Sequence, residues 1–178
     1  GLPAPKTLGF TSQFNITGFV GNTDLEGVFL GDKTADAGED LVTAAAYELG
    51  KAALAAYAIG LADRVASNLR ADFEDGNVKK IYNIDFGESF IESVLPDLAE
   101  QYRMFDVLMK AAAVSEPVLR EAAWKQYLKG VGDAYDQVSQ TIAADRDYFK
   151  TLAAKCRYTR FALDRLSGIE KSEFLGLM

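Results

Sequence analysis

The sequence predicts an α+β domain that is rich in helices, with one β-hairpin and a small N-terminal β region. Three observations predict this fold class. Residues 8–31 are rich in β-branched and aromatic residues, residues 78–84 repeat that composition, and almost everything after Gly87 has helical character. We therefore expect a β-rich region over residues 1–35 and a helical body, interrupted by the hairpin, over residues 36–178.

The first elements are expected to be short strands followed by one long helix. Residues 8–31 predict two or three strands with a turn near Gly21, because glycine interrupts the β-forming residues. A polar linker follows, and apolar residues then recur at helical spacing over residues 40–59. Gly60 is expected to end this helix.

A β-hairpin is predicted immediately before the helical half of the chain. Residues 69–73 and residues 78–84 both favour strands, and the turn-forming residues Glu-Asp-Gly-Asn at positions 74–77 separate them. This spacing is typical of two antiparallel strands joined by a tight turn.

Helices account for the rest of the expected fold. One should cover residues 88–112 with a break near Pro96, and a second should run from a Ser115 cap to about Gly130. One or two more are expected over residues 131–166, where aromatic and aliphatic residues recur at helical spacing.

Two features of these helices have mainly structural interpretations. Trp124 and Tyr127 lie three residues apart, which is typical of aromatic side chains in a helical core. Residues 146–165 form the locally basic part of the chain. They are either a docking face for an acidic partner or a solvated helix face with alternating charges.

Composition argues against several classes of function. The net charge of −7 argues against binding to nucleic acid or to anionic lipid, since both depend on clusters of Lys and Arg. The absence of His excludes an imidazole base. The single cysteine, Cys156, excludes an internal disulfide, and with no His to activate it we expect a buried structural thiol. No apolar run is long enough to predict a transmembrane segment. The acidic charge, the single cysteine and the lack of a recognisable secretory signal favour the cytoplasm, or delivery into a cytoplasm.

Asp63, Asn68 and Asp85 form a constellation with a definite chemical meaning. Asp63 and Asn68 lie in the loop after the long helix, and Asp85 follows the hairpin. A helix, a loop and a hairpin in this order would bring the three side chains together at the opening of one site. Phosphoryl transfer needs a carboxylate that orients the attacking hydroxyl, together with hard oxygen ligands for magnesium. The constellation therefore predicts a magnesium-dependent phosphotransferase.

A resemblance to the phosphoinositide 3-/4-kinase-like branch of the kinase superfamily is carried by residues 59–90, which read IGLADRVASNLRADFEDGNVKKIYNIDFGESF. In that family the catalytic loop reads Gly-x-x-Asp-Arg-His-x-x-Asn and the metal strand reads His-Ile-Asp-Phe-Gly. The resemblance implies a kinase-like fold, mainly its helical C-lobe, with ATP and Mg²⁺ as cofactors. It implies that Asp63 is the catalytic residue and that Asn68 and Asp85 are the metal ligands. Ile84 and Asp85 would bind the nucleotide, with Ile84 under the adenine.

The sequence also departs from the pattern of that family. Val65 stands where the family has His, and Arg70 stands where kinases usually have an apolar residue under the adenine ring. Neither Lys6 nor Lys33 lies in a predicted strand, as the phosphate-binding lysine of a kinase would. Two organisations remain open. Either the N-lobe is much reduced, or the chain is a C-lobe that works with a missing half or an activating protein partner.

The expected acceptor follows from charge. The segment after Gly87 is acidic and has no basic residue before Arg103, so it would repel a phosphorylated head group. A hydroxyl of a protein or of a small neutral molecule is therefore favoured.

Two other interpretations remain. The chain could be a catalytically inactive kinase-like fold or fragment that acts as a protein-interaction module. Alternatively, Asp63, Asn68 and Asp85 are ordinary turn residues, for which Asp and Asn are common choices.

Overall fold

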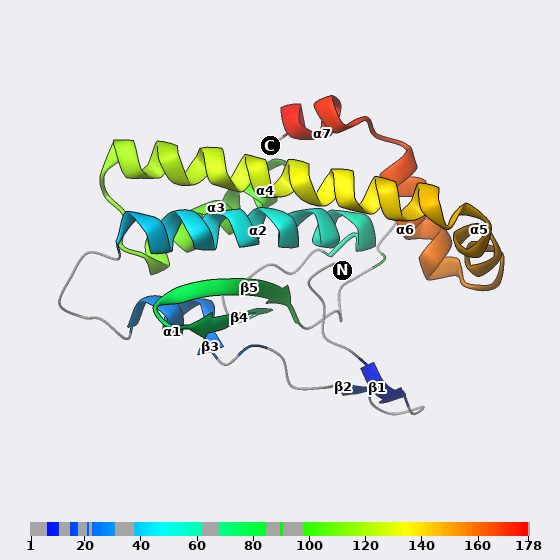
Figure 1. Ribbon diagram of the computed structural model, residues 1–178, viewed down its shortest axis with the longest axis horizontal. Helices are drawn as coiled ribbons and strands as arrows, with labels where there is room; N and C mark the ends of the chain where they lie inside the picture. The colour runs from blue at the N-terminus through cyan, green and yellow to red at the C-terminus, as the bar shows by residue number, and fades with distance from the viewer. Residues whose placement is uncertain are drawn as a thin grey trace.

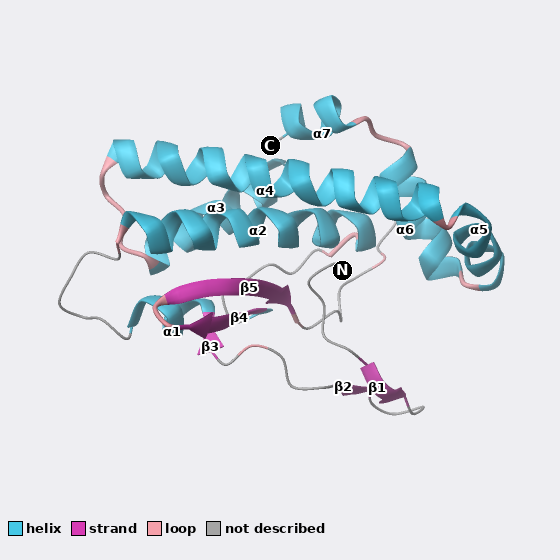
Figure 2. Cartoon of the chain, viewed as in Figure 1, coloured by secondary structure: helices cyan, strands magenta, loops and turns pink. Residues whose placement is uncertain are grey.

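The computed structural model describes residues 7–10, 15–17, 21, 23–30, 38–61, 68–84, 90 and 98–177. These described residues form an α+β fold that is rich in helices (Figures 1 and 2). The strands are β1 (Thr7–Phe10), β2 (Asn15–Thr17), β3 (Thr23–Asp24), β4 (Leu69–Glu74) and β5 (Asn77–Asn83). The helices are α1 (Leu25–Leu30), α2 (Glu39–Ile59), α3 (Leu98–Ala111), α4 (Pro117–Ala144), α5 (Arg146–Lys155), α6 (Arg157–Ser167) and α7 (Lys171–Leu177).

Helix α2 is the central element, with the β3–β4–β5 sheet on one side and α4 on the other (Figure 1). It is covered on both sides, and its residues between Val42 and Ala58 are mostly buried. A helix that is apolar nearly all round belongs in the interior, and its many alanines let both neighbouring layers approach closely. The expected long helix is confirmed, and its sequence explains its central position.

The hairpin is confirmed, and its turn has the expected chemistry. Strands β4 and β5 pair antiparallel, and Asp75 and Gly76 form the turn with φ of 52° and 74°. Two residues with positive φ are the signature of the turns that suit the twist of a β-hairpin. A register shift at Asp72 lets both Val78 and Ile81 reach the buried face.

The N-terminal β region divides between two sheets. Strands β1 and β2 pair only with each other among the described residues, whereas β3 joins the hairpin through β4. Leu25 and Val28 of α1 belong to the main core. Residues 23–30 therefore pack with the hairpin and the helices. The boundary expected at residue 35 lies outside the described residues, and the division into two regions stays a prediction.

The crossing of α2 and α4 depends on a reciprocal pair of glycines. A Cβ atom on Gly50 would lie 2.1 Å from the carbonyl oxygen of Tyr127, and one on Gly130 would lie 2.0 Å from that of Tyr47. The two backbones are thus too close for any other residue at either position. The prediction that this helix ends at about Gly130 is wrong, because the glycine provides a contact between helices and α4 continues to Ala144.

Other helix boundaries also differ from the prediction. Helix α4 is preceded by Glu116 as its N-cap with Pro117 at its first position, so the expected Ser115 cap is one residue early. Helix α3 matches the later part of the helix expected over residues 88–112. Phe90 has φ of 64° and is not helical, and residues 91–97, including the expected break at Pro96, lie outside the described residues.

An aromatic cluster joins α3 to α4. The ring centroid of Phe105 lies 4.9 Å from that of Trp124 and 5.7 Å from that of Tyr127, which is fully buried. The prediction that these aromatic residues belong to the core is confirmed for Tyr127, and Trp124 packs against that core while partly buried.

Helix α7 had no counterpart in the predicted elements. It packs back onto α4, with Phe174 buried against the ring of Tyr57. Among the described residues, no helix combines the length and the apolar composition that a membrane crossing requires.

Candidate functional site

The C-terminus of α2 fixes one end of the loop that carries Asp63. Gly60 has a left-handed conformation, with φ of 60° and ψ of 44°. Its backbone N–H donates to the carbonyl of Tyr57 at 3.1 Å, and the N–H of Leu61 donates to that of Ala56 at 3.0 Å. This is the glycine-ended helix terminus that the sequence predicted. We call residues 59–61 the helix end.

The start of the hairpin fixes the other end of that loop. The N–H of Ile84 donates to the carbonyl of Asn68 at 2.8 Å, which extends the strand pairing by one step beyond Leu69 and Asn83. Asn68 and Ile84, two residues of the predicted site, are therefore neighbours in space. We call this pair the ladder end.

A buried amide attaches the hairpin to α2. The side chain of Asn83 is 2% exposed, and its Nδ2 donates to the carbonyl oxygen of Ala52 at 3.0 Å. A buried amide needs such a partner, because leaving it unpaired costs about 1–3 kcal/mol. The bond adds a polar attachment to the apolar packing of β5, and with it the ladder end, against α2.

The chain that leaves β5 returns to the helix end. The N–H of Phe90 donates to the carbonyl of Ile59 at 2.7 Å. The segment that carries the Asp-Phe-Gly sequence therefore begins after the ladder end and closes at the helix end.

Two short segments of the chain, which we call loops for their place between the described elements, thus share both of their ends. Residues 62–67 contain Asp63 and run from the helix end to the ladder end, and residues 85–89 contain Asp85 and run between the same two points. Asp63 and Asp85 themselves lie outside the described residues, so their predicted roles stay predictions. The structure does bring together the attachment points of both loops.

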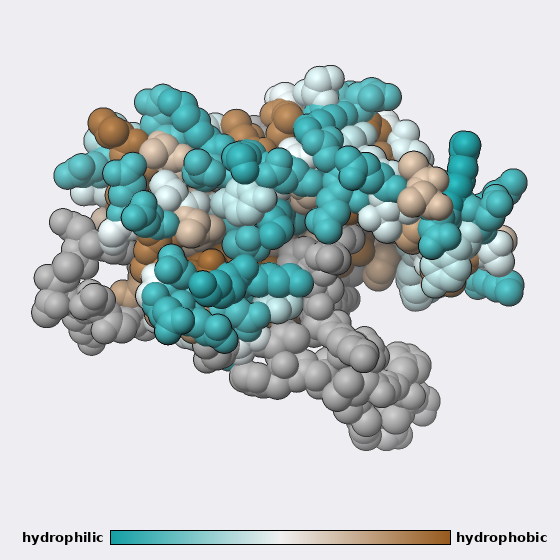
Figure 3. Space-filling model, viewed as in Figure 1, coloured by the Kyte–Doolittle hydropathy of each residue, from teal (hydrophilic) through white to brown (hydrophobic). Residues whose placement is uncertain are grey.

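The face of the sheet that points away from α2 is polar. Leu69 and Ala71 are buried, so the alternation of a strand places Arg70 on the opposite face. There a guanidinium nitrogen of Arg70 donates to the carbonyl oxygen of Gly21 at 3.3 Å. The space-filling view shows hydrophilic side chains gathered over the hairpin (Figure 3).

One hydrogen bond on this face raises the pKa of a tyrosine. The hydroxyl of Tyr82 donates to Oδ2 of Asp72 at 2.7 Å. Hydrogen bonding to Asp72, followed by burial, raises the pKa of Tyr82 to about 12. Lys80 lies 5.0 Å from the centre of the same ring. These contacts are structural, and the sequence patterns did not indicate them.

Of the two predicted metal ligands, Asn68 lies among the described residues and Asp85 does not. No group of three or more His, Cys, Asp or Glu side chains in the described part of the chain could hold a metal ion, and that part does not include Asp63 or Asp85. The amide oxygen of Asn68 is a hard donor of the kind that magnesium prefers. Asn68 lies at the ladder end, where its backbone carbonyl accepts a hydrogen bond from Ile84, the residue before Asp85.

Cys156 is not the buried thiol that the sequence predicted. It is partly exposed, in an extended conformation at the break between α5 and α6. Hydrogen bonding to Thr159 lowers the pKa of its thiol. The residue lies where one helix ends and the next begins, and this break in the helical structure leaves it partly exposed.

Comparisons of this chain with protein-family models, with curated proteins and with solved structures found no match. The resemblance of residues 59–90 to a kinase core therefore stays a prediction. The proposed site therefore rests on the geometry of this chain alone. Its two loops have common ends, and the hydrogen bond from Ile84 to Asn68 closes one of these ends.

Proposed function

We propose that this chain is a kinase-like phosphotransferase that moves a phosphoryl group from magnesium-bound ATP to a hydroxyl of a protein or of a small neutral molecule. The observation that carries the proposal is the shared ends of the two loops. The hydrogen bond from Ile84 to Asn68 closes one end, and the bond from Phe90 to Ile59 closes the other.

Chain connectivity limits how far Asp63 and Asp85 can lie from these shared ends. Consecutive Cα atoms are about 3.8 Å apart, so Asp85 starts one such step from Ile84, whose N–H is bonded to Asn68. Asp63 follows Leu61 at the helix end by two residues. Asp85 is therefore tethered to the ladder end and Asp63 to the helix end. The two segments that carry them connect the same two points, and this supports the proposal of one site.

The roles follow from the chemistry of the side chains. Asp63 would accept a hydrogen bond from the attacking hydroxyl and hold it in line with the phosphate. Asn68 and Asp85 would supply oxygen atoms to Mg²⁺, which neutralises negative charge on the phosphates when it is bound. Ile84, which is half-buried, would give the adenine an apolar contact.

The test is thermal unfolding with and without millimolar MgATP, for the wild-type chain and for Asp85→Asn. A ligand present at 100 times its dissociation constant adds about 2.7 kcal/mol of stability, so we expect the midpoint of wild type to rise. The rise should require the metal and should disappear in Asp85→Asn. The matched control is Asp75→Asn, the same change in the exposed turn at the far end of the same hairpin, where Asn tolerates the positive φ.

A second candidate is an inactive kinase-like fold that binds a protein. The observation that favours it is the bond from Arg70 to the Gly21 carbonyl, which places a cation where the resemblance expects an apolar contact for adenine. An equal midpoint with and without MgATP in wild type would contradict the enzyme and leave this candidate.

A further inference from the structure

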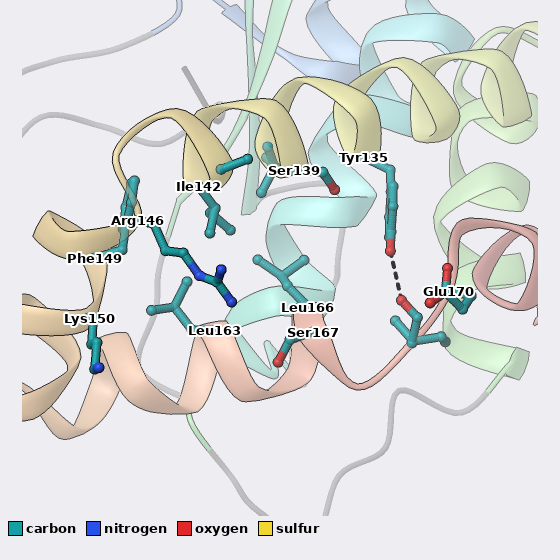
Figure 4. A pocket seen from close by; sticks show the side chains of 13 residues that line it. Tyr135, Ser139, Ile142, Arg146, Phe149, Lys150, Leu163, Leu166, Ser167 and Glu170 are labelled. Atoms are coloured by element: carbon teal, nitrogen blue, oxygen red, sulfur yellow. Dashed lines mark hydrogen bonds between the residues drawn. The ribbon is translucent and has the colours of Figure 1, made fainter.

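A cavity of about 560 Å³ lies between the C-terminal part of α4, α5 and α6 (Figure 4). Its volume falls within the range of about 300–1,000 Å³ that is usual for small-ligand sites. Apolar side chains from all three helices line it, and they are Val138, Ile142, Phe149, Leu163 and Leu166. In Figure 4, Ile142 points down from α4 while Leu163 and Leu166 point up from α6.

The fold leaves this apolar lining incompletely buried, although Val138 and Leu166 pack against the main core. Neither α5 nor α6 contributes a single buried residue among those described, although α6 is strongly amphipathic. Leu163 and Leu166 on α6 and Phe149 on α5 are only half-buried. A ligand between the helices would complete the burial of these side chains, which is a favourable contribution roughly proportional to the apolar area covered.

The basic and the acidic side chains of the cavity lie at opposite ends. The side chain of Arg146 extends into the space between α4 and α6, and Lys150 lies one turn further along α5 (Figure 4). Among the described residues, neither of these cations has an ion-pair partner. The acidic side chain in the lining, Glu170, lies at the opposite end, beside the hydrogen bond from Tyr135 to the Ile169 carbonyl at 2.7 Å.

We propose that this cavity binds a small amphipathic anion, namely a carboxylate with an unbranched apolar chain. The carboxylate lies against Arg146 and Lys150, where Arg offers two parallel donors to its two oxygen atoms. The apolar chain lies against Ile142, Leu163 and Leu166. Glu170 repels an anion at the other end and so disfavours the reversed orientation. This site is separate from the proposed phosphotransferase site and does not depend on it.

The first experiment compares head groups on one chain length by isothermal titration calorimetry. Octanoate, octan-1-ol and octyltrimethylammonium are titrated into the full chain. We expect octanoate to bind tightest, octanol more weakly, and the cation weakest. Decanoate should bind more tightly than octanoate by about fourfold for each added CH₂ group. Equal affinity for the three head groups, or no saturable binding, would overturn the proposal.

The second experiment tests the residues. Arg146→Gln should weaken octanoate binding about fivefold, which is the upper end of what an exposed ion pair contributes to affinity. It should leave octanol binding unchanged. A second test is Lys150→Gln, with Lys155→Gln as its matched control. Both variants make the same change on α5, but Lys150 lines the cavity and Lys155 does not. Lys150→Gln should weaken octanoate binding, and Lys155→Gln should not.

The location is read from amide chemical shifts. Octanoate should shift the amide signals around Leu163 and Ser167, which line the cavity. Shifts confined to other parts of the chain, or unchanged octanoate affinity in Arg146→Gln, would contradict the assignment of this cavity.

Discussion

At the scale of single residues, the pair of Tyr82 and Asp72 shows how one hydrogen bond couples stability to pH. The phenol donates to the carboxylate at 2.7 Å, on the polar face of the hairpin. Ionised Tyr82 would be a like-charge neighbour of Asp72 and would lose the bond, so the folded state holds the proton more tightly than the unfolded chain does. The pKa of Tyr82 is raised to about 12 from 10.0 for this reason.

The raised pKa predicts a defined loss of stability at high pH. Tyr82 contributes fully below pH 10, and its contribution falls as the pH rises through about 12, because there the unfolded chain binds fewer protons than the folded one. The difference in unfolding free energy between wild type and Tyr82→Phe should therefore narrow from pH 9 to pH 12. Urea titrations across this range measure it. Tyr148→Phe is the matched control, because it removes the same hydroxyl from a residue that is 59% exposed.

At the scale of elements, local patterns predicted those parts of the fold that local chemistry determines. The hairpin followed from Asp75 and Gly76, whose positive φ the turn requires, and the end of α2 followed from Gly60. The length of α4 could not be predicted in this way, because a glycine within a helix is indistinguishable in sequence from one that ends it. Only the partner helix reveals that Gly130 is a point of contact.

The candidate site likewise has features that local sequence predicts and features that depend on distant contacts. Its residue types and their order in the chain are visible in the sequence, and so is the hairpin that joins Asn68 to Ile84. The bond from Phe90 to Ile59, which gives the two loops common ends, joins residues far apart in sequence and had no local signal.

The helix crossing gives a prediction with an internal control. Gly130→Ala should destabilise the protein by about 1–3 kcal/mol, because its Cβ would lie 2.0 Å from the carbonyl oxygen of Tyr47 and the two backbones cannot both keep their positions. Gly132→Ala, two residues along the same helix, meets only side-chain atoms, with Lys171 at 3.3 Å and Leu175 at an ordinary contact distance of 4.0 Å. It should be neutral or stabilising by up to about 1 kcal/mol, because Ala favours a helix. Urea unfolding measures both, and equal effects would contradict the close crossing.

At the scale of the whole molecule, the proposed site depends on how α2 holds the hairpin. Helix α2 is buried between the sheet and α4, so its position is fixed by both layers. The helix end belongs to α2 and the ladder end to the hairpin, and the side chain of Asn83 is hydrogen-bonded to α2 through the Ala52 carbonyl. A change at Asn83 should therefore alter the distance between the two ends without touching any residue proposed to bind nucleotide or metal.

Asn83→Ala separates this positioning effect from stability. Removing the buried amide should lower the unfolding free energy by about 1–3 kcal/mol, because the Ala52 carbonyl loses a donor. It should also reduce the stabilisation that MgATP provides, measured as the shift in midpoint relative to the same variant without ligand. Asn77→Ala is the control, since it makes the same change at the exposed far end of β5 and should keep the full MgATP shift. If Asn83→Ala loses stability but keeps the full shift, the ladder end does not set the geometry of the nucleotide site. If wild type itself shows no shift, the proposed phosphotransferase function is wrong, and the loss of stability in Asn83→Ala still measures the attachment of the hairpin to α2.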